Sequence, residues 1–178
     1  MKNTLPTATP TDANNTESRS NRLRDYEIDP VAVRAACENA LETWRPAMGE
    51  FFLARFLGLA LRYDDQHCTI DFDVADFMLN PKGTLHGGII ALTLDTSMGH
   101  LLSHLYGTAS TLEMKVQYLR AVAPGPAKVV ASVLKKGHSV CFLQADFYDS
   151  SGEMAAFATS TWKLSARHNP QPLPATAS

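Results

Sequence analysis

The 178-residue chain has few of the features that mark specialised classes of protein. Its three cysteines, Cys37, Cys68 and Cys141, are odd in number and form no CxxC pair, which argues against a disulfide framework or a zinc site. A net charge of -2 gives no electrostatic reason to expect nucleic-acid binding. No apolar run approaches the roughly 20 residues that span a bilayer. We therefore expect a cytoplasmic protein in a reducing setting, without metal, other cofactor, nucleic acid or membrane partner.

The two ends of the chain differ in composition from its middle. Residues 1–26 are rich in Thr, Asn, Ser and Pro, lack the apolar core of a secretory signal, and contain acidic residues that argue against a transit peptide. Residues 166–178 have a similar composition. We expect both segments to be disordered tails. The folded domain is then predicted to span residues 27–165, and an apolar content of 45% is enough for a sizeable core.

Between the tails, the hydrophobic pattern predicts one helix, then strands, a long helix and more strands. DPVAVRAACENALETW begins with an Asp-Pro pair typical of a helix start, and HCTIDFDV alternates as a half-buried strand does. A long apolar helix is predicted from Gly87 to about Leu105. The segments after Gly107 alternate again, with turns at PGP, KKGH and DSSGE. Grouped strands predict an α+β fold, an antiparallel sheet wrapped around a long central helix.

The long helix carries one carboxylate, Asp95, in an otherwise apolar segment. An unpaired buried carboxylate costs several kcal/mol, so Asp95 either meets solvent, is capped by a hydroxyl such as that of Thr96, or has a function. At the helix start, Gly87 and Gly88 leave amide N–H groups open, at the end of the helix that favours negative charge. Such donors suit an oxyanion developing on a carbonyl. A plain glycine-rich turn is the alternative interpretation of these two residues.

The spacing between these two features sets a geometric condition. Asp95 follows Gly87 by eight residues, which is about 12 Å along a helix. Catalysis requires the reacting carbon to lie within about 3–3.5 Å of both the attacking group and the donors. One chain cannot satisfy this, but two antiparallel copies of the helix can. A catalytic site would therefore be shared across a symmetric dimer and would occur twice.

The segment NPKGTLHGGIIALTLDTSMG resembles the signature of hotdog-fold acyl-CoA thioesterases of the PaaI-like and THEM2-like type. The matching residues are Asn80, Gly83, His86, Gly87, Gly88 and Asp95. TLEMKVQYLR and LKKGHS also resemble that family, and the resemblance covers about Phe52 to Leu164. It implies a hotdog fold, hydrolysis of an acyl- or aryl-acyl-CoA, and homodimers with a continuous sheet that often pair into tetramers.

The resemblance also implies roles for individual residues. Asp95 would be the catalytic carboxylate, acting as nucleophile on the thioester or as base for a water. The amide of Gly87, helped by that of Gly88, would form the oxyanion hole. Asn80 would position the water or the thioester, His86 would order the turn or touch the thioester, and Thr111 would assist the acid. Four further residues would contact the phosphates of coenzyme A or be solvated turn residues: Arg120, Lys136, Gly137 and His138.

Other interpretations of the sequence remain. A non-catalytic hotdog protein that binds acyl-CoA as a sensor or scaffold would keep the cleft but has no need of Asp95. A hotdog hydratase would require a paired Asp and His at another spacing. GHSVC resembles a GxSxG nucleophile elbow, but too little chain follows Ser139 to supply the rest of a triad. His100 and His104 have the i, i+4 spacing of zinc ligands but lack a third ligand, so we expect a solvated helix end.

Overall fold

The computed structural model describes residues 27–165, so both predicted tails lie outside the described residues. The three helices are α1, α2 and α3, and a short 3-10 helix, η2, precedes α3. Six strands complete the domain. The elements in chain order are α1 Pro30–Thr43, α2 Phe52–Phe56, β1 Ala60–Tyr63, β2 His67–Val74, η2 Asp76–Met78, α3 Gly87–Tyr106, β3 Ala109–Tyr118, β4 Gly125–Lys136, β5 Val140–Tyr148 and β6 Met154–Leu164.

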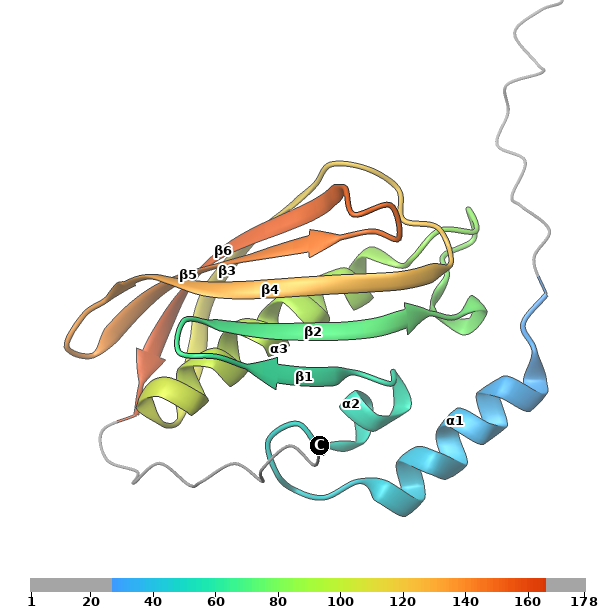
Figure 1. Cartoon of the computed structure of the whole chain (residues 1–178), viewed down its shortest axis with the longest axis horizontal. Helices are drawn as coiled ribbons and strands as arrows, with labels where there is room; N and C mark the ends of the chain where they lie inside the picture. The colour runs from blue at the N-terminus through green and yellow to red at the C-terminus, as the bar shows by residue number, and fades with distance from the viewer. Residues whose placement is uncertain (1–26, 166–178) are drawn as a thin grey trace, which may run out of the picture.

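The strands form one antiparallel sheet in the order β1-β2-β4-β5-β6-β3. The chain leaves the sheet after β2, forms α3, and returns as β3 at the far edge, so β1 and β3 are the two edge strands. In Figure 1 the sheet curves in front of α3, which crosses its inner face. This is the predicted α+β architecture, and it confirms the expectation of a hotdog fold. The predicted turns lie where β4 joins β5 and where β5 joins β6.

The core lies between α3 and the inner face of the sheet. Alternation along the strands directs every second side chain toward α3, as in β2, where Cys68, Ile70, Phe72 and Val74 are buried. Leu94, Met98 and Leu101 of α3 are fully buried against this face. Each buried Leu, Ile, Phe or Met contributes about 1.5–3 kcal/mol of hydrophobic stabilisation. The helix is therefore held firmly along one side, while its other side carries Asp95, which is half-buried.

A β-bulge in β3 changes which residues face the helix. Thr111 pairs with Trp162 and Glu113 with Thr161, so Leu112 is an extra residue between two consecutive positions of β6. The bulge reverses the alternation within β3. Thr111 before it and Tyr118 after it therefore both face α3, although an odd number of positions separates them.

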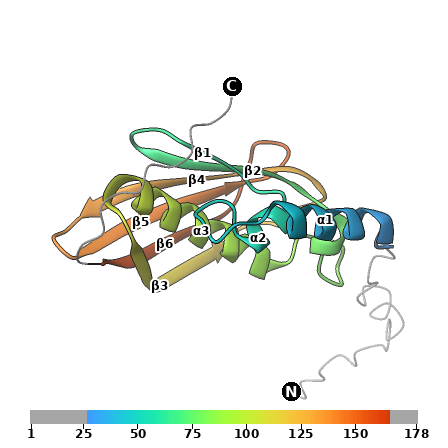
Figure 2. The same cartoon turned by 90° about the horizontal axis from the view of Figure 1, so that it is seen from below.

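Helix α1 is anchored at its start. Asp29 is its N-cap and accepts from the Val31 N–H at 2.8 Å, with Pro30 at the first helical position, as the sequence predicted. The Asp29 N–H in turn donates to a carboxylate oxygen of Asp76 in η2 at 2.6 Å. Helix α1 packs against α2 and lies outside the sheet (Figures 1 and 2).

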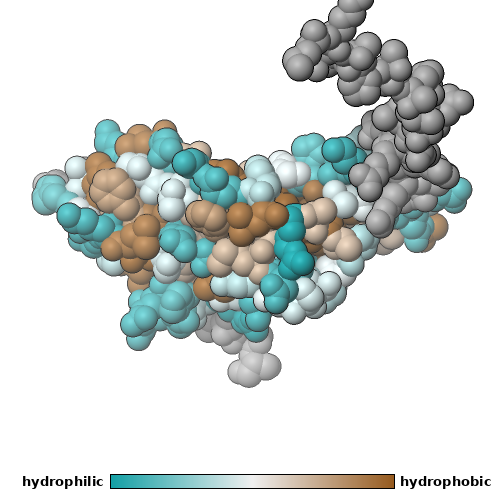
Figure 3. Space-filling view, turned by 90° about the horizontal axis from the view of Figure 1, so that it is seen from above, coloured by the Kyte–Doolittle hydropathy of each residue, from teal (hydrophilic) through white to brown (hydrophobic). Residues whose placement is uncertain are grey.

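Apolar and polar side chains are mixed on the surface, as the face in Figure 3 shows. Two large apolar side chains of β3, Leu112 and Tyr118, are 57% and 54% exposed. Within residues 27–165, no helix is long and apolar enough to cross a membrane.

Candidate active site

The loop before α3 is built by Asn80. Its side-chain oxygen accepts from the Lys82 N–H at 2.8 Å, and its amide nitrogen donates to the Thr84 hydroxyl at 2.9 Å. Its backbone closes a turn with Gly83, whose φ of 70° suits glycine. The Asn80 side chain is thus occupied within its own loop. Asn80 therefore shapes the loop, and its contact with water or the thioester stays a prediction.

His86 is the N-cap of α3. Its ring Nδ1 accepts from the Gly88 N–H at 2.9 Å, and its backbone N–H donates to the Met78 carbonyl at 2.9 Å. Because Nδ1 accepts a hydrogen bond, the proton of the neutral ring is on Nε2, and the ring is exposed. His86 therefore orders the turn, as one of its two predicted roles required.

The two glycines of the turn differ in what their amides can do. The Gly88 N–H is taken by His86, so Gly88 is not the open donor that the sequence predicted. For the Gly87 N–H, no acceptor within the described residues lies in hydrogen-bonding geometry. An unpartnered N–H at a helix N-terminus is a ready donor for a carbonyl or oxyanion.

Asp95 and Thr111 lie side by side. The Thr111 hydroxyl donates to Asp95 Oδ1 at 2.8 Å, joining the middle of α3 to the start of β3. Sixteen residues separate the two in the chain, and the bulge at Leu112 makes the contact possible. A hydroxyl that donates to a carboxylate fixes the orientation of that carboxylate.

Tyr118 is a site residue that the sequence did not reveal. Its hydroxyl donates to the Gly87 carbonyl at 3.0 Å, from the end of β3. Its ring also lies 3.4 Å from the position that a Cβ on Gly87 would occupy. In the sequence, Tyr118 is one of several apolar residues that alternate along a strand, so no signal separates it from them.

The candidate coenzyme A contacts are not brought together within one chain. Arg120 follows β3 and lies 3.7 Å from carboxylate oxygens of both Asp149 and Glu153. Lys136 is the last residue of β4 and lies at the end of the sheet where β6 ends. Its Nζ lies 5.1 Å from the centre of the Tyr106 ring. Because β6 has 11 residues, these ends are about 35 Å apart.

Gly137 and His138 form the hairpin beyond Lys136. The Gly137 N–H donates to the Val140 carbonyl at 2.8 Å, and a Cβ on Gly137 would lie 2.5 Å from that oxygen. Gly137 is therefore required by the tight turn. His138 is exposed and lines a surface pocket of about 360 Å³. The other residues lining it are Tyr106, Lys136, Ser139, Leu164 and Ser165.

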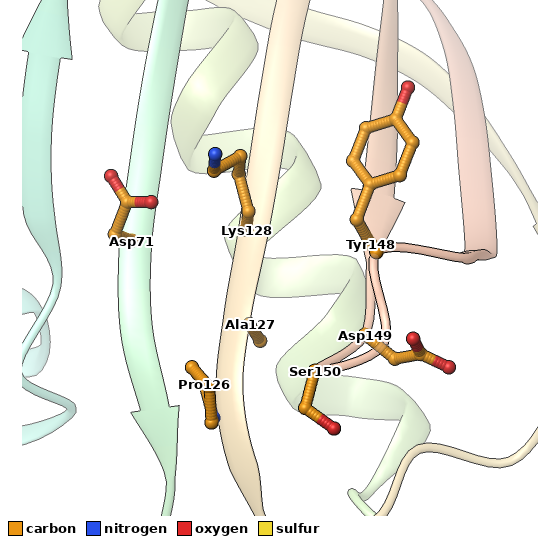
Figure 4. A pocket seen from close by; sticks show the side chains of 8 residues that line it. Asp71, Pro126, Ala127, Lys128, Tyr148, Asp149 and Ser150 are labelled. Atoms are coloured by element: carbon orange, nitrogen blue, oxygen red, sulfur yellow. The ribbon is translucent and has the colours of Figure 1, made fainter.

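A second pocket, of about 380 Å³, lies on the opposite face of the sheet. Asp71, Lys128 and Tyr148 stand in one row across β2, β4 and β5, as Figure 4 shows. Phe72 and Phe147, their neighbours in the chain, are buried against α3, so the row faces away from the helix. This pocket is therefore separated by the sheet from Gly87 and Asp95.

The interpretation of His100 and His104 as a solvated helix end is wrong for His100. That residue is 4% exposed, and its Nδ1 lies 2.7 Å from the Tyr63 hydroxyl. Burial lowers the pKa of His100 to about 4 and raises the pKa of Tyr63. His104 is exposed and stacks on the Tyr63 ring. Among residues 27–165, no group of three or more His, Cys, Asp or Glu could hold a metal ion.

Several known proteins are similar to this chain in sequence or fold. Residues 82–156, which include Gly87, Asp95 and Thr111, match the model of the thioesterase superfamily. A protein of Saccharolobus solfataricus, provisionally named an esterase, is 34% identical over 85 residues, which cover 46% of this chain and 60% of that protein. The match thus spans about three fifths of that relative's length.

Two solved structures extend the comparison. A conserved protein of Pseudomonas aeruginosa is 28% identical with a TM-score of 0.58, over 68% of this chain and 96% of that one. The PaaI protein of E. coli, from the phenylacetic acid degradation operon, is 16% identical with a TM-score of 0.64, over 74% and 96%. The chain therefore has the hotdog fold, and its residues 82–156 match the thioesterase superfamily model. The predicted resemblance is confirmed.

Proposed function

We propose that the protein is an acyl-CoA thioesterase, which hydrolyses the thioester of an acyl- or aryl-acyl-CoA to the free acid and coenzyme A. One observation carries the proposal: a carboxylate held by a hydroxyl and an unpartnered helix N-terminal amide occur in a thioesterase-superfamily segment. A cytoplasmic location stays an expectation that rests on the three free cysteines.

The chemistry follows from these groups. The thioester carbonyl oxygen would accept from the Gly87 N–H and from the exposed Nε2–H of His86. Asp95 would attack the carbonyl carbon directly, or take a proton from a water that attacks it. Charge that develops on the carbonyl oxygen is stabilised by donors already in place. The carbon–sulfur bond then breaks and the thiolate of coenzyme A leaves. On the direct route this step leaves an anhydride between Asp95 and the acyl group, which water would then hydrolyse to the free acid and the Asp95 carboxylate. Thr111 would hold the Asp95 carboxylate in place through its hydrogen bond.

The site would be completed by a second copy of the chain. Asp95 and Gly87 are about 12 Å apart along α3, too far to act on one thioester. Strand β3 is a ten-residue sheet edge with exposed apolar side chains, and such an edge is a template for pairing. The other edge strand, β1, has only four residues.

We propose one register for this pairing, which takes the bulge in β3 into account. A two-fold axis at Lys115 pairs that residue with its own copy. Because bulged Leu112 takes no place in the ladder, Thr111 then lies opposite Tyr118 of the partner subunit. Since Thr111 holds Asp95 and Tyr118 holds Gly87, this register brings each carboxylate toward the other chain's amide. Two such dimers could pair further into a tetramer.

A cysteine cross-link tests this register. In a Cys37→Ser background, we expect Lys115→Cys to form a symmetric intersubunit disulfide on oxidation, because directly opposed strand residues are close enough for one. Gln117→Cys is the matched control, since two copies of residue 117 would be offset by four positions, or about 13 Å. Equal cross-linking of both variants, or of neither, would contradict the register.

The same pairing would assemble the coenzyme A contacts. Arg120 of the partner subunit would lie opposite Ala109, which pairs with Leu164, a residue of the pocket that Lys136 and His138 line. Positive side chains from two subunits would then flank one pocket. Phosphate groups suit such a cluster of positive charge.

The proposal is tested by thiol release from short, long and aromatic acyl-CoA panels. We expect turnover of at least one class, and a fall in kcat of at least about 100-fold in Asp95→Asn with the dimer intact. Asp73→Asn, an exposed acid on β2, is the control and should keep wild-type kcat. Tight binding of acyl-CoA without thiol release would instead favour the sensor or scaffold function.

A further inference from the structure

Tyr118 is held against the turn at the start of α3 by two separate contacts. Its hydroxyl donates to the Gly87 carbonyl, and its ring covers the Cα of Gly87. Within a single chain the residue is nevertheless 54% exposed, so burial of its ring in that chain does not explain the contact. A carbonyl oxygen has two lone pairs, so Gly87 can accept from Tyr118 in addition to a bond within the helix.

The Gly87 carbonyl and the Gly88 N–H belong to the same planar peptide unit. The carbonyl end of this unit accepts from Tyr118, and the N–H end donates to His86 Nδ1. In a trans peptide the two groups point in opposite directions, so the unit is held from both sides. Tyr118, the peptide and His86 therefore form one chain of hydrogen bonds from β3 to the N-cap.

This series of hydrogen bonds affects which nitrogen of the His86 ring carries the proton. A donor on the carbonyl polarises the peptide and strengthens its N–H as a donor, because linked hydrogen bonds reinforce one another. The stronger the Gly88 N–H bond, the more firmly Nδ1 is kept as acceptor and the proton on Nε2. Without Tyr118, the peptide could tilt and the ring could turn.

We infer that Tyr118 is a positioning residue of the active site: through the peptide between Gly87 and Gly88 it fixes the His86 ring with Nε2–H as donor. The inference rests on the proposed thioesterase function for its effect on catalysis. It does not make Tyr118 a catalytic residue, since the contact that Tyr118 makes is with backbone. Its two groups have separate roles: the ring packs on Gly87, and the hydroxyl orients the peptide.

Tyr118→Phe separates these parts, because it keeps the ring and removes the hydroxyl. We expect kcat to fall about 3- to 10-fold, the value of one hydrogen bond, with KM within about twofold of wild type and Tm almost unchanged. Tyr63→Phe is the matched control, because it also removes a tyrosine hydroxyl that is hydrogen-bonded next to α3. That hydroxyl contacts His100, outside the candidate site. Tyr63→Phe should keep kcat per folded molecule.

Nitrogen-15 NMR of histidine-labelled protein gives a second readout that needs no substrate. The His86 signals are assigned with His86→Gln. In the neutral ring of the wild type, they should show protonated Nε2 and unprotonated Nδ1. In Tyr118→Phe, we expect the two tautomers to mix. Unchanged tautomer signals in Tyr118→Phe would overturn the inference, as would an unchanged kcat where Asp95→Asn is inactive.

Failure of the proposed function looks different from failure of this inference. If the wild type releases no thiol from any acyl-CoA, the thioesterase proposal is wrong, and the NMR comparison still decides whether Tyr118 fixes His86. If the wild type is active and Tyr118→Phe loses activity only in step with Tm, the hydroxyl is merely structural and the inference is wrong.

Discussion

The two halves of α3 each carry a histidine associated with a tyrosine, yet they are built differently. At the N-terminal end, His86 is exposed, Tyr118 binds backbone, and the Gly87 amide is left without an acceptor among the described residues. In the C-terminal half, His100 is buried and meets the hydroxyl of Tyr63 directly. One end keeps hydrogen-bonding groups ready for another molecule. The other satisfies its polar groups internally and anchors the helix.

The largest expected effect concerns the anchored half. Burial lowers the pKa of His100 from 6.5 to about 4, which corresponds to about 3 kcal/mol. Because the folded state resists protonation, this stability is fully present above pH 6.5 and is lost as pH falls toward 4. Denaturant unfolding at several pH values should show the loss in wild type and a flatter profile in His100→Gln. The control, His104→Gln at an exposed position, should show the same pH dependence of unfolding free energy as wild type. A His100→Gln profile as steep as that of wild type would contradict this explanation.

The next effect concerns the open half. A Cβ on Gly88 would lie 2.9 Å from His86 Nδ1, so Gly88→Ala must displace the ring. We expect kcat for thioester hydrolysis to fall about 100-fold, as on loss of an oxyanion donor, with Tm nearly unchanged. Steady-state kinetics and thermal unfolding of the same preparation check this. Wild-type kcat would show that the His86 position is not needed.

The same substitution in the anchored half should have the opposite result. A Cβ on Gly99 would lie 2.9 Å from Trp162, whose indole N–H donates to Ser160 at 2.6 Å. Forcing the ring away from the helix should cost about 2 kcal/mol of unfolding free energy, as overpacking does. Activity per folded molecule of Gly99→Ala should be retained. A variant that is stable but inactive would mean that the two halves are not independent.

The smallest effect is expected for the candidate coenzyme A contacts. Lys136→Ala should raise KM for an acyl-CoA about threefold without changing kcat, and the difference should shrink in high salt because exposed charges are screened. Lys128→Ala, on the opposite face of the sheet, is the control and should leave KM unchanged. A salt-independent change would point to packing against Tyr106 as its cause.

Periodicity was sufficient to predict the elements but not their neighbours. The apolar pattern identified the long helix, the strand at residues 68–74 and both hairpins, because each depends on local alternation. The spacing of Gly87 and Asp95 likewise depends only on helix rise. Strand order comes from long-range pairing, so the sequence does not show that Lys136, at the end of β4, lies far from Arg120 within one chain.

Within the candidate site, the errors have local physical causes. Gly88 was expected to be an open donor because the sequence does not show that the ring of His86 turns back onto its N–H. His100 was expected to be solvated because its partner, Tyr63, comes from a strand 37 residues away. Thr111 was reached by resemblance alone, since its contact with Asp95 depends on a bulge that no pattern indicates.

The hydrogen bond between Asp29 and Asp76 joins the start of α1 to the segment that supports the His86 turn. Asp76 starts the short η2 helix, whose last residue, Met78, holds the His86 N–H through its carbonyl. Only Phe77 separates Asp76, which anchors α1, from Met78, whose carbonyl accepts from the His86 N–H. A shortened protein that starts at Asp29 keeps this brace, whereas one that starts after α1 loses it although every residue around Asp95 remains. For this protein, the first helix is therefore part of the smallest unit worth expressing.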